Sequence, residues 1–257
     1  MPAGSIQSSK AGAGQNSPRF ILDALANLVF PFHCPICEAI TDLRERPWCD
    51  ACGRRVGLWT KSFCPQCRRF RSENWRPCPG EHDELQPVRV RALGAYDDAF
   101  GPVVRGLKYD GLQALAAPLG CLLAERLRGC VADFHAVVSV PTVPRKRRER
   151  GFGHAELIAT HLADALNLPY LVEAMRLLRR VDDQTRLSPT ERQRNVEGAF
   201  GVGDPAEIRG WNILLVDDVM TTGATLGEAS RALVAAGATN VAAAVVALNV
   251  GETDDTR

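Results

Sequence analysis

The segment ILLVDDVMTTGAT, residues 213–225, limits the possible folds of this chain more than any other stretch. Its four leading aliphatic residues predict a buried strand, and this strand runs directly into Asp217 and Asp218. Two apolar residues and a small, hydroxyl-rich turn follow, before a predicted helix that begins near Leu226. Ligands of open α/β sheets bind beyond the carboxyl ends of the strands. The segment therefore predicts a binding site at the edge of a sheet.

The turn in this segment has the chemistry of an anion site. A helix N-terminus presents unpaired backbone N–H groups and a partial positive charge. Threonine hydroxyls add donors, and Gly223 lets the backbone come close to a phosphate. Carboxylates cannot bind phosphate directly, so Asp217 and Asp218 are expected to accept hydrogen bonds from sugar hydroxyls or to contact a metal ion through them. The alternative is that these residues only cap the next helix, but capping accounts for one Asp or Thr and not for the whole string.

Apolar periodicity after Pro87 alternates between strands and helices. Strands are predicted at 88–96, 136–141, 213–218 and 241–249, and helices at 101–109, 112–128, 154–167 and 225–237. Such alternation implies a parallel sheet covered on both faces. With 46% hydrophobic residues the chain can fill that core. The predicted fold class is α/β, with a mostly parallel sheet flanked by helices.

Cysteine spacing predicts a metal-binding module nearer the N-terminus. Seven of the nine cysteines lie between Cys34 and Cys78, mostly as C-x-x-C pairs in a stretch poor in aliphatic residues. That stretch cannot fold around an apolar core of its own, and no thioredoxin-like strand and helix surrounds the pairs. Cys34, Cys37, Cys49 and Cys52 supply four thiolates at a spacing suited to tetrahedral Zn²⁺. A closed four-ligand site of this kind is structural and not catalytic.

Cys64, Cys67, Cys78 and His82 form a second, less regular set of candidate zinc ligands. Three arrangements stay open: two successive zinc ribbons, one zinc ion with the second set spare, or an interleaved pairing of the two sets. His82 is either a ligand or a solvated surface histidine. The prediction is one or two structural zinc ions.

Two polar segments complete the candidate site. The strand that ends at Pro141 is followed by a basic loop with Arg145, Lys146 and Arg150, whose clustered cations can hold pyrophosphate. A solvated basic loop is the alternative. The long polar segment 182–200 is either a mobile flap that closes on the ligand or an exposed connection.

Residues 213–225 resemble the thirteen-residue signature of type I phosphoribosyltransferases, whose substrate is 5-phosphoribosyl-1-pyrophosphate (PRPP). The match is complete: four apolar residues, Asp-Asp, two apolar residues and Thr-Thr-Gly-Ala-Thr. The resemblance implies that Asp217 and Asp218 are the candidate catalytic pair and contact the ribose hydroxyls. It also implies that the turn binds the 5′-phosphate and that Mg²⁺ binds together with PRPP. The candidate PRPP-binding residues are then Val219, Met220, Thr221, Thr222, Gly223, Ala224, Thr225, Arg145, Lys146 and Arg150.

The order of motifs along the whole chain is similar to that of the ComF family of competence-associated phosphoribosyltransferase-like proteins. The motifs are the cysteine module, LKYDG (107–111), VPTVPRKRRERGF (140–152), QTRLSPTERQRNVEGAF (184–200) and LLVDDVMTTGAT (214–225). The resemblance covers about Leu25 to Asn249, and it implies a type I phosphoribosyltransferase fold preceded by a double zinc ribbon. One departure is visible: members commonly read Gly-Phe-Asn-Gln where this chain has Gly151-Phe152-Gly153-His154.

The expected organisation follows from these segments. It comprises a disordered N-terminus (1–19), an amphipathic helix (20–33), a zinc-ribbon module (34–85), a phosphoribosyltransferase domain (86–250) and a C-terminal tail (251–257). The formal net charge of +1 does not indicate a nucleic acid or a membrane as a partner. No apolar run is long enough to span a bilayer and no signal-peptide core is visible, so a cytoplasmic protein is expected.

Three functions are compatible with this reading. The first is a phosphoribosyltransferase that moves the phosphoribosyl group of PRPP to an acceptor that the sequence does not identify. The second, implied by the ComF resemblance, is a protein that handles single-stranded DNA with the competence and DNA-uptake machinery. Its candidate contacts are the module's cations and aromatics, Arg54, Arg55, Trp59, Lys61, Arg68, Arg69, Phe70, Arg71 and Trp75, although the aromatics equally suit covering the small metal-centred folds. The third is a non-catalytic protein for which PRPP is a regulatory ligand.

Overall fold

A six-stranded sheet with the order β2-β1-β3-β8-β7-β4 is the centre of the computed structural model. Four of its strands run parallel: β3 (Val90–Ala95), β8 (Asn240–Leu248), β7 (Asn212–Met220) and β4 (Ala136–Ser139). The predicted α/β class with a mostly parallel sheet is therefore confirmed. The structure describes residues 32–41, 46–71, 89–97, 99–181 and 188–249.

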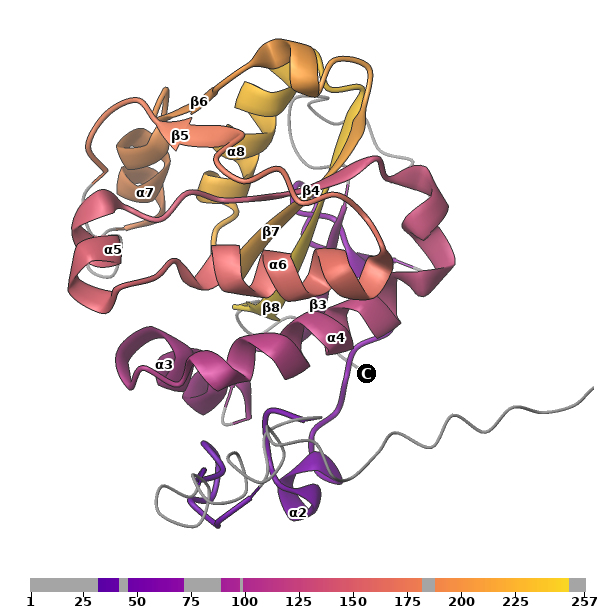
Figure 1. Ribbon diagram of the computed structural model, residues 1–257, viewed down its shortest axis with the longest axis vertical. Helices are drawn as coiled ribbons and strands as arrows, with labels where there is room; N and C mark the ends of the chain where they lie inside the picture. Colours follow the sequence, from indigo (N-terminus) through magenta and orange to yellow (C-terminus); the bar gives the residue numbers. More distant parts are fainter. Residues whose placement is uncertain (1–31, 42–45, 72–88, 98, 182–187, 250–257) are drawn as a thin grey trace, which may run out of the picture.

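Two apolar cores lie on opposite faces of this sheet. In β7, Leu214 and Val216 belong to one core, whereas Ile213 and Leu215 belong to the other, because successive side chains of a strand point to opposite faces. The first core is covered by α3 (Phe100–Tyr109), α4 (Ala116–Leu127) and α6 (His154–Leu166). The second is covered by α8 (Ala224–Ala235) and a small hairpin of β5 (Met175–Leu177) and β6 (Phe200–Val202). Figure 1 shows α4 and α6 on one side of the sheet and α8 with the hairpin on the other.

The cysteine module is joined to the sheet. Its strands β1 (Ser62–Phe63) and β2 (Phe70–Arg71) form an antiparallel hairpin, and Phe63 of β1 pairs with Val90 of β3. The module's short helix α2 (Asp50–Gly53) follows Cys49. Trp48 packs edge-on against Phe100 of α3, with ring centroids 5.5 Å apart. The module thus shares the core of the larger domain, in agreement with its lack of aliphatic residues, and the boundary between 34–85 and 86–250 stays a prediction.

Several elements differ from the sequence-based expectation. The basic segment expected as a loop is a short helix, α5 (Pro144–Arg150), closed by Gly151 in the left-handed conformation. The polar segment contains a helix, α7 (Pro189–Val196), whose N-terminus has a complete capping box between Ser188 and Glu191. The hairpin β5–β6 that frames this segment was also not predicted. Short 3-10 turns lie at Gln113–Leu115, Arg128–Asp133 and Pro205–Glu207.

Some predictions concern residues outside the described part of the chain. These are the N-terminus 1–19, nearly all of the helix 20–33, the ligands Cys78 and His82, and the tail 251–257. Among the described helices, none is both long and apolar enough to cross a membrane.

Candidate functional site

A cavity of about 390 Å³ opens at the carboxyl ends of the parallel strands. The cavity is open to solvent between the two helical layers. It lies where β4 ends and the adjacent strand β7 continues. β4 pairs with β7 only as far as Ser139 opposite Val216, whereas β7 continues beside β8 to Met220. Pro141 then turns the chain away and lines the cavity. The flank of β7 beyond Val216 is thereby uncovered, and this is where the two aspartates lie.

Asp217 and Asp218 both line the cavity and lie within β7, which continues two residues beyond them to Met220. The backbone N–H of Asp218 donates to Oδ1 of Asp217 at 2.8 Å. Burial, and next the charge of Asp218, raises the pKa of Asp217 to about 7, against the opposing effect of Lys108. Asp217 is therefore poised between its neutral and charged forms near neutral pH, so a ligand that brings positive charge or hydroxyl donors favours the carboxylate.

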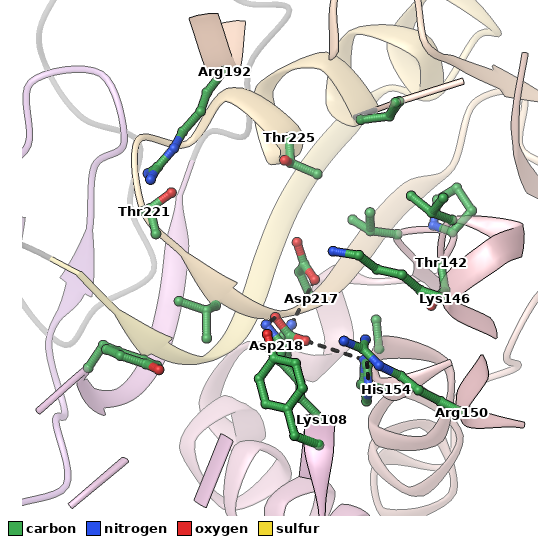
Figure 2. Close-up of a pocket in the computed structure, with 18 of the residues that line it drawn as sticks. Lys108, Thr142, Lys146, Arg150, His154, Arg192, Asp217, Asp218, Thr221 and Thr225 are labelled. Atoms are coloured by element: carbon green, nitrogen blue, oxygen red, sulfur yellow. Dashed lines mark hydrogen bonds and ion pairs between the residues drawn. The ribbon is translucent and has the colours of Figure 1, made fainter. Parts of the chain in front are cut away.

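A polar network surrounds the second aspartate (Figure 2). Lys108 Nζ lies 2.8 Å from Asp218 Oδ1, and His154 Nδ1 lies 3.8 Å from Asp218 Oδ2. On its other side, His154 Nε2 lies 3.3 Å from a guanidinium nitrogen of Arg150. Because a guanidinium only donates, Nε2 is the acceptor and the proton of the neutral ring sits on Nδ1, facing Asp218.

The charge states in this network have clear physical causes. Burial lowers the pKa of His154 to about 4, with Asp218 acting in the opposite direction and Arg150 adding to the decrease. Burial also lowers the pKa of Lys108, but the adjacent Asp218 outweighs it and the net pKa is raised. At neutral pH the cluster therefore holds a charged lysine and an uncharged histidine.

Of the predicted PRPP-binding residues Val219 to Thr225, only some line the cavity. Val219, Thr221 and Thr225 line the cavity, and Gly223 has a φ of 85°, which favours glycine. Thr222 Oγ1 accepts a 3.4 Å hydrogen bond from the backbone N–H of residue 224 and so stays at the start of α8. The side chains of Met220 and Ala224 are buried in the second core. These last two positions hold the turn in place, and any contact they make with a ligand is through the backbone.

The basic side chains of α5 face two different environments. Lys146 and Arg150 line the cavity, and their role toward pyrophosphate stays a prediction. Arg145 is not among the lining residues, and its Nε lies 2.7 Å from Glu149 on the exposed face. Arg147 pairs with Glu156 at 3.0 Å beside a neighbouring cavity. Helical periodicity explains the division, because residues four apart share a face.

The cavity also contains residues that the sequence analysis did not place there: Tyr96, Lys108, Tyr109, Thr142, His154, Arg192 and Asn249. Lys108 and Tyr109 are part of the LKYDG motif. This motif contributed to the family resemblance, but its residues were not predicted to have a specific role. Arg192 comes from α7, so the polar segment does reach the cavity (Figure 2). The S-P-T-E string before Arg192 was the available signal for that helix.

The first cysteine set forms a compact cluster. The four sulfurs of Cys34, Cys37, Cys49 and Cys52 all lie within 4.8 Å of one another, and the pair Cys37 and Cys49 is 3.6 Å apart. Four thiolates at such separations fit a tetrahedral Zn²⁺ ion, and Cys34 and Cys52 are buried in the first core. The predicted structural zinc site is thus supported by geometry as well as spacing.

The second C-x-x-C pair lies in the β1–β2 hairpin, beside the turn from Thr221 to Thr225. The backbone N–H of Arg68 donates to Cys64 O at 2.9 Å and that of Cys64 to Arg69 O at 3.0 Å, as in a tight knuckle. Pro65, between the two cysteines, lies 4.0 Å from the position that a Cβ on Gly223 would take. The metal module therefore packs against the turn that was predicted to hold phosphate.

Comparison with known families agrees with both halves of this description. The family model for the phosphoribosyl transferase domain matches residues 150–256, and the model for the double zinc ribbon domain matches residues 25–81. The second match contains all seven clustered cysteines and ends one residue before His82.

Curated relatives cover most of the chain. It is 30% identical over 221 residues to the DNA utilization protein YhgH of Salmonella typhimurium, which covers 83% of this chain and 96% of that protein. It is 29% identical to competence protein ComFC of Bacillus subtilis, over 74% of this chain and 78% of that one. It is 24% identical to competence protein F of Haemophilus influenzae, over 79% and 91%.

Among solved structures, the chain is similar to a glutamine PRPP amidotransferase from B. subtilis complexed with ADP and GMP. The TM-score is 0.36 and the identity 22%, over 51% of this chain and 25% of that chain.

Proposed function

Since the chain belongs to the ComF family of competence-associated phosphoribosyltransferase-like proteins, we propose that its cavity binds PRPP and supports phosphoribosyl transfer to a nitrogen acceptor. The observation that carries this proposal is the position of the paired aspartates between two anion sites. Thr221 and Thr225 lie on one side of Asp217, and the cations of α5 lie on another side of the same cavity.

This arrangement matches the covalent order of PRPP. A 5′-phosphate at the N-terminus of α8 is held by backbone N–H groups and threonine hydroxyls. The ribose hydroxyls then lie at Asp217 and Asp218, which accept their hydrogen bonds. The pyrophosphate on C1 lies toward Lys146 and Arg150, whose charges oppose its negative charge.

Magnesium fits the same donor set. Mg²⁺ prefers oxygen ligands and is usually bound by one or two carboxylates together with substrate phosphates. Asp217 and Asp218 supply such oxygens beside the proposed ribose position. When bound, Mg²⁺ would add positive charge to the pyrophosphate.

The proposed transfer is a substitution at C1 of PRPP. A bond forms between the acceptor nitrogen and C1, the C1–O bond to pyrophosphate breaks, pyrophosphate leaves with the electron pair, and the acceptor's N–H proton passes to solvent. Lys146 and Arg150 contribute by stabilising the charge that develops on the leaving group. The remaining residues contribute by positioning.

The decisive test is calorimetric titration with Mg·PRPP. We expect saturable binding that the double substitution Asp217→Asn, Asp218→Asn abolishes or strongly weakens. A second pair of ligands isolates the carboxylates: ribose 5-phosphate is expected to bind more tightly than 2-deoxyribose 5-phosphate, because the deoxy sugar lacks one hydroxyl donor. No detectable heat, or unchanged binding by the double variant, would exclude the proposal. Binding without pyrophosphate release in the presence of nitrogen bases and ammonium would instead identify PRPP as a regulatory ligand.

A second proposed function, the handling of single-stranded DNA, is favoured by the names of the relatives and by the surface of the metal module. Among its described residues, the exposed cations include Arg54, Arg55, Lys61, Arg68 and Arg69. Trp59 and Phe70, in contrast, pack edge-on with centroids 4.8 Å apart and lie against the second core. Trp75 and the side chain of Arg71 lie outside the described part of the chain. The described residues therefore favour contacts to DNA phosphates over base stacking on these two rings.

Phosphate contacts of this kind are strongly salt-dependent. We expect binding of a labelled oligonucleotide to weaken as salt rises, and the double substitution Arg54→Ala, Arg55→Ala to lower both the affinity and the salt slope. Arg128→Ala, an exposed cation outside the module, is the matched control. Binding that is insensitive to salt, or equally weakened by the control, would rule out this surface.

A further inference from the structure

We propose that Glu228 is a positioning residue: by accepting the backbone N–H of Gly198 it holds α7 on α8, so that Arg192 of α7 reaches the 5′-phosphate of the ligand. This inference rests on the proposed PRPP site. It adds two residues to that site, Arg192 in contact with the ligand and Glu228 acting through Arg192.

Four basic side chains are found among the described residues that line the cavity: Lys108, Lys146, Arg150 and Arg192. Lys108 is paired with Asp218 at 2.8 Å, and Lys146 and Arg150 belong to α5, on the side proposed for pyrophosphate. A 5′-phosphate carries a charge of about −2 and is proposed to lie at the N-terminus of α8. Arg192 is the lining cation that comes from neither of the first two groups.

The direction of the Arg192 side chain agrees with a place at the 5′-phosphate. In Figure 2 it points from α7 toward Thr221, on the side of Asp217 away from Arg150. The threonine hydroxyls at this end supply neutral donors, whereas a guanidinium supplies several N–H donors and a full positive charge. Arginine also matches phosphate oxygens in a bidentate geometry. Arg192 and the N-terminus of α8 therefore suit contacts to one phosphate from two sides.

Helical periodicity explains why Arg192 faces the protein. Val196 lies four residues later in α7, is fully buried and belongs to the second core. Residues four apart share a helix face, so burial of Val196 turns Arg192 inward as well. Arg194, two residues from each, is exposed. The position of Arg192 thus depends on how the end of α7 is held.

This end of α7 is held by the helix that begins at the proposed phosphate position. Gly198, two residues after α7, has a φ of 63°, and its N–H donates to Oε1 of Glu228 at 2.8 Å. Glu228 lies on α8 with 7% of its surface exposed, and its Oε2 lies 3.2 Å from Nε of Arg231. Hydrogen bonds to a carboxylate are stronger than neutral ones. One helix therefore carries the phosphate donors at its N-terminus and, about one turn later, the anchor for Arg192.

A second contact at the same end of α7 is exposed. Nε of Arg179 donates to Glu197 O at 3.1 Å, and Arg179 is an exposed side chain. An exposed hydrogen bond competes with water and contributes less than one to a shielded carboxylate. Glu228 is therefore the contact expected to decide where α7 lies.

Ribose 5-phosphate is the probe, because it carries the 5′-phosphate and no pyrophosphate. We expect Arg192→Ala to weaken its binding about 10- to 100-fold, the loss typical of a charge-assisted contact. Arg194→Ala, an exposed cation of the same helix that is not among the lining residues, is the matched control and should not weaken binding. Glu228→Ala should weaken binding by a factor similar to that of Arg192→Ala. Glu228→Gln, whose amide oxygen still accepts from Gly198, should keep most of the affinity.

A double-mutant cycle separates positioning from a general loss of stability. If Glu228 acts through Arg192, adding Glu228→Ala to Arg192→Ala costs no further affinity for ribose 5-phosphate. Glu228→Asp is the second variant in case the alanine variant does not fold, because it keeps the charge but is one methylene shorter. Its loss of affinity should likewise vanish in the Arg192→Ala background.

The outcomes separate this inference from the function on which it rests. Additive losses in the cycle, or unchanged binding by Glu228→Ala, refute the positioning role. If Arg192→Ala weakens binding of PRPP but not of ribose 5-phosphate, Arg192 lies at the pyrophosphate, so the inference fails and the PRPP site stands. Failure of both ligands to bind the unsubstituted protein overturns the proposed function and this inference together.

Discussion

Lys108 at the end of α3 forms a 2.8 Å ion pair with Asp218 on β7, and this contact joins a helix of the first layer to the central strand at the site. Both side chains are largely shielded, with 24% and 11% of their surfaces exposed. The pair lies at the point where the ribose hydroxyls are proposed to bind.

Removing the lysine charge should destabilise the protein. Lys108→Met leaves the Asp218 carboxylate without its partner in a shielded position, which typically costs about 1–3 kcal/mol. Thermal unfolding at pH 7.5 measures this loss. Arg46→Met is the control, because the pair of Arg46 with Glu125 is 3.9 Å long and about half exposed on each side, and such pairs contribute little. Equal effects of the two substitutions would contradict the role given to Lys108.

The stability of the ligand-free protein should depend on Asp217. Its pKa is raised to about 7, whereas an unfolded aspartate ionises near 4. Between these values the folded chain keeps a proton that the unfolded chain has released, so stability is lost as pH rises through about 7. Asp217→Asn removes this loss, and its Tm relative to the unsubstituted protein should increase from pH 5 to pH 8. The comparison isolates Asp217, because the lowered pKa of His154 acts on both proteins alike. A difference in Tm that is constant with pH would be inconsistent with a raised pKa.

His154 should be replaceable by glutamine but not by leucine. The ring is neutral at pH 7, accepts from Arg150 at Nε2 and keeps its proton on Nδ1, which lies 3.8 Å from Asp218. A glutamine amide also has one donor and one acceptor end. His154→Gln should therefore keep the Tm and the affinity for ribose 5-phosphate nearly unchanged. His154→Leu leaves shielded polar groups unpaired and should cost about 1–3 kcal/mol. The hypothesis fails if glutamine is as damaging as leucine.

Zinc should support both the cysteine module and α3. Cys37→Ser should lose one equivalent of zinc by elemental analysis and lower the Tm, because Cys34 and Cys52 share the first core with Trp48, which packs on Phe100. Cys121→Ser, an exposed cysteine on α4, should change neither quantity. Two equivalents in the unsubstituted chain would support successive zinc ribbons. Full zinc content in Cys37→Ser would contradict this ligand set.

Gly120 should be intolerant of alanine although it lies inside a helix. A Cβ there would come within 2.8 Å of the Leu162 backbone nitrogen in α6, and backbone cannot move aside easily. Overpacking of this kind costs about 1–3 kcal/mol, which exceeds the helix propensity gained. Gly129→Ala is the control, since nothing lies within 4 Å of its Cβ position. Thermal unfolding of the two variants compares them, and equal Tm values would show that α4 and α6 are not so close.

The strands of the parallel sheet, the first cysteine cluster and the turn from Thr221 to Thr225 could be predicted from the amino-acid sequence. These features are encoded locally, by the period of apolar residues, by C-x-x-C spacing and by a string whose members are adjacent in the chain. For the same reason, β3, α3, α6 and β8 were predicted to within a few residues. The capping box of α7 was equally local and was overlooked.

Which side chains share the cavity depends on the tertiary structure. Lys108, His154 and Asp218 are far apart in sequence, and only the packing of α3 and α6 against β7 brings them together. Arg150 lines the cavity, whereas Arg145 faces away from it. The tertiary structure also places Pro65 beside Gly223. A local pattern specifies the path of the backbone, but it does not specify the distance between segments. That distance is set by how the two apolar cores fill, which depends on the whole chain at once.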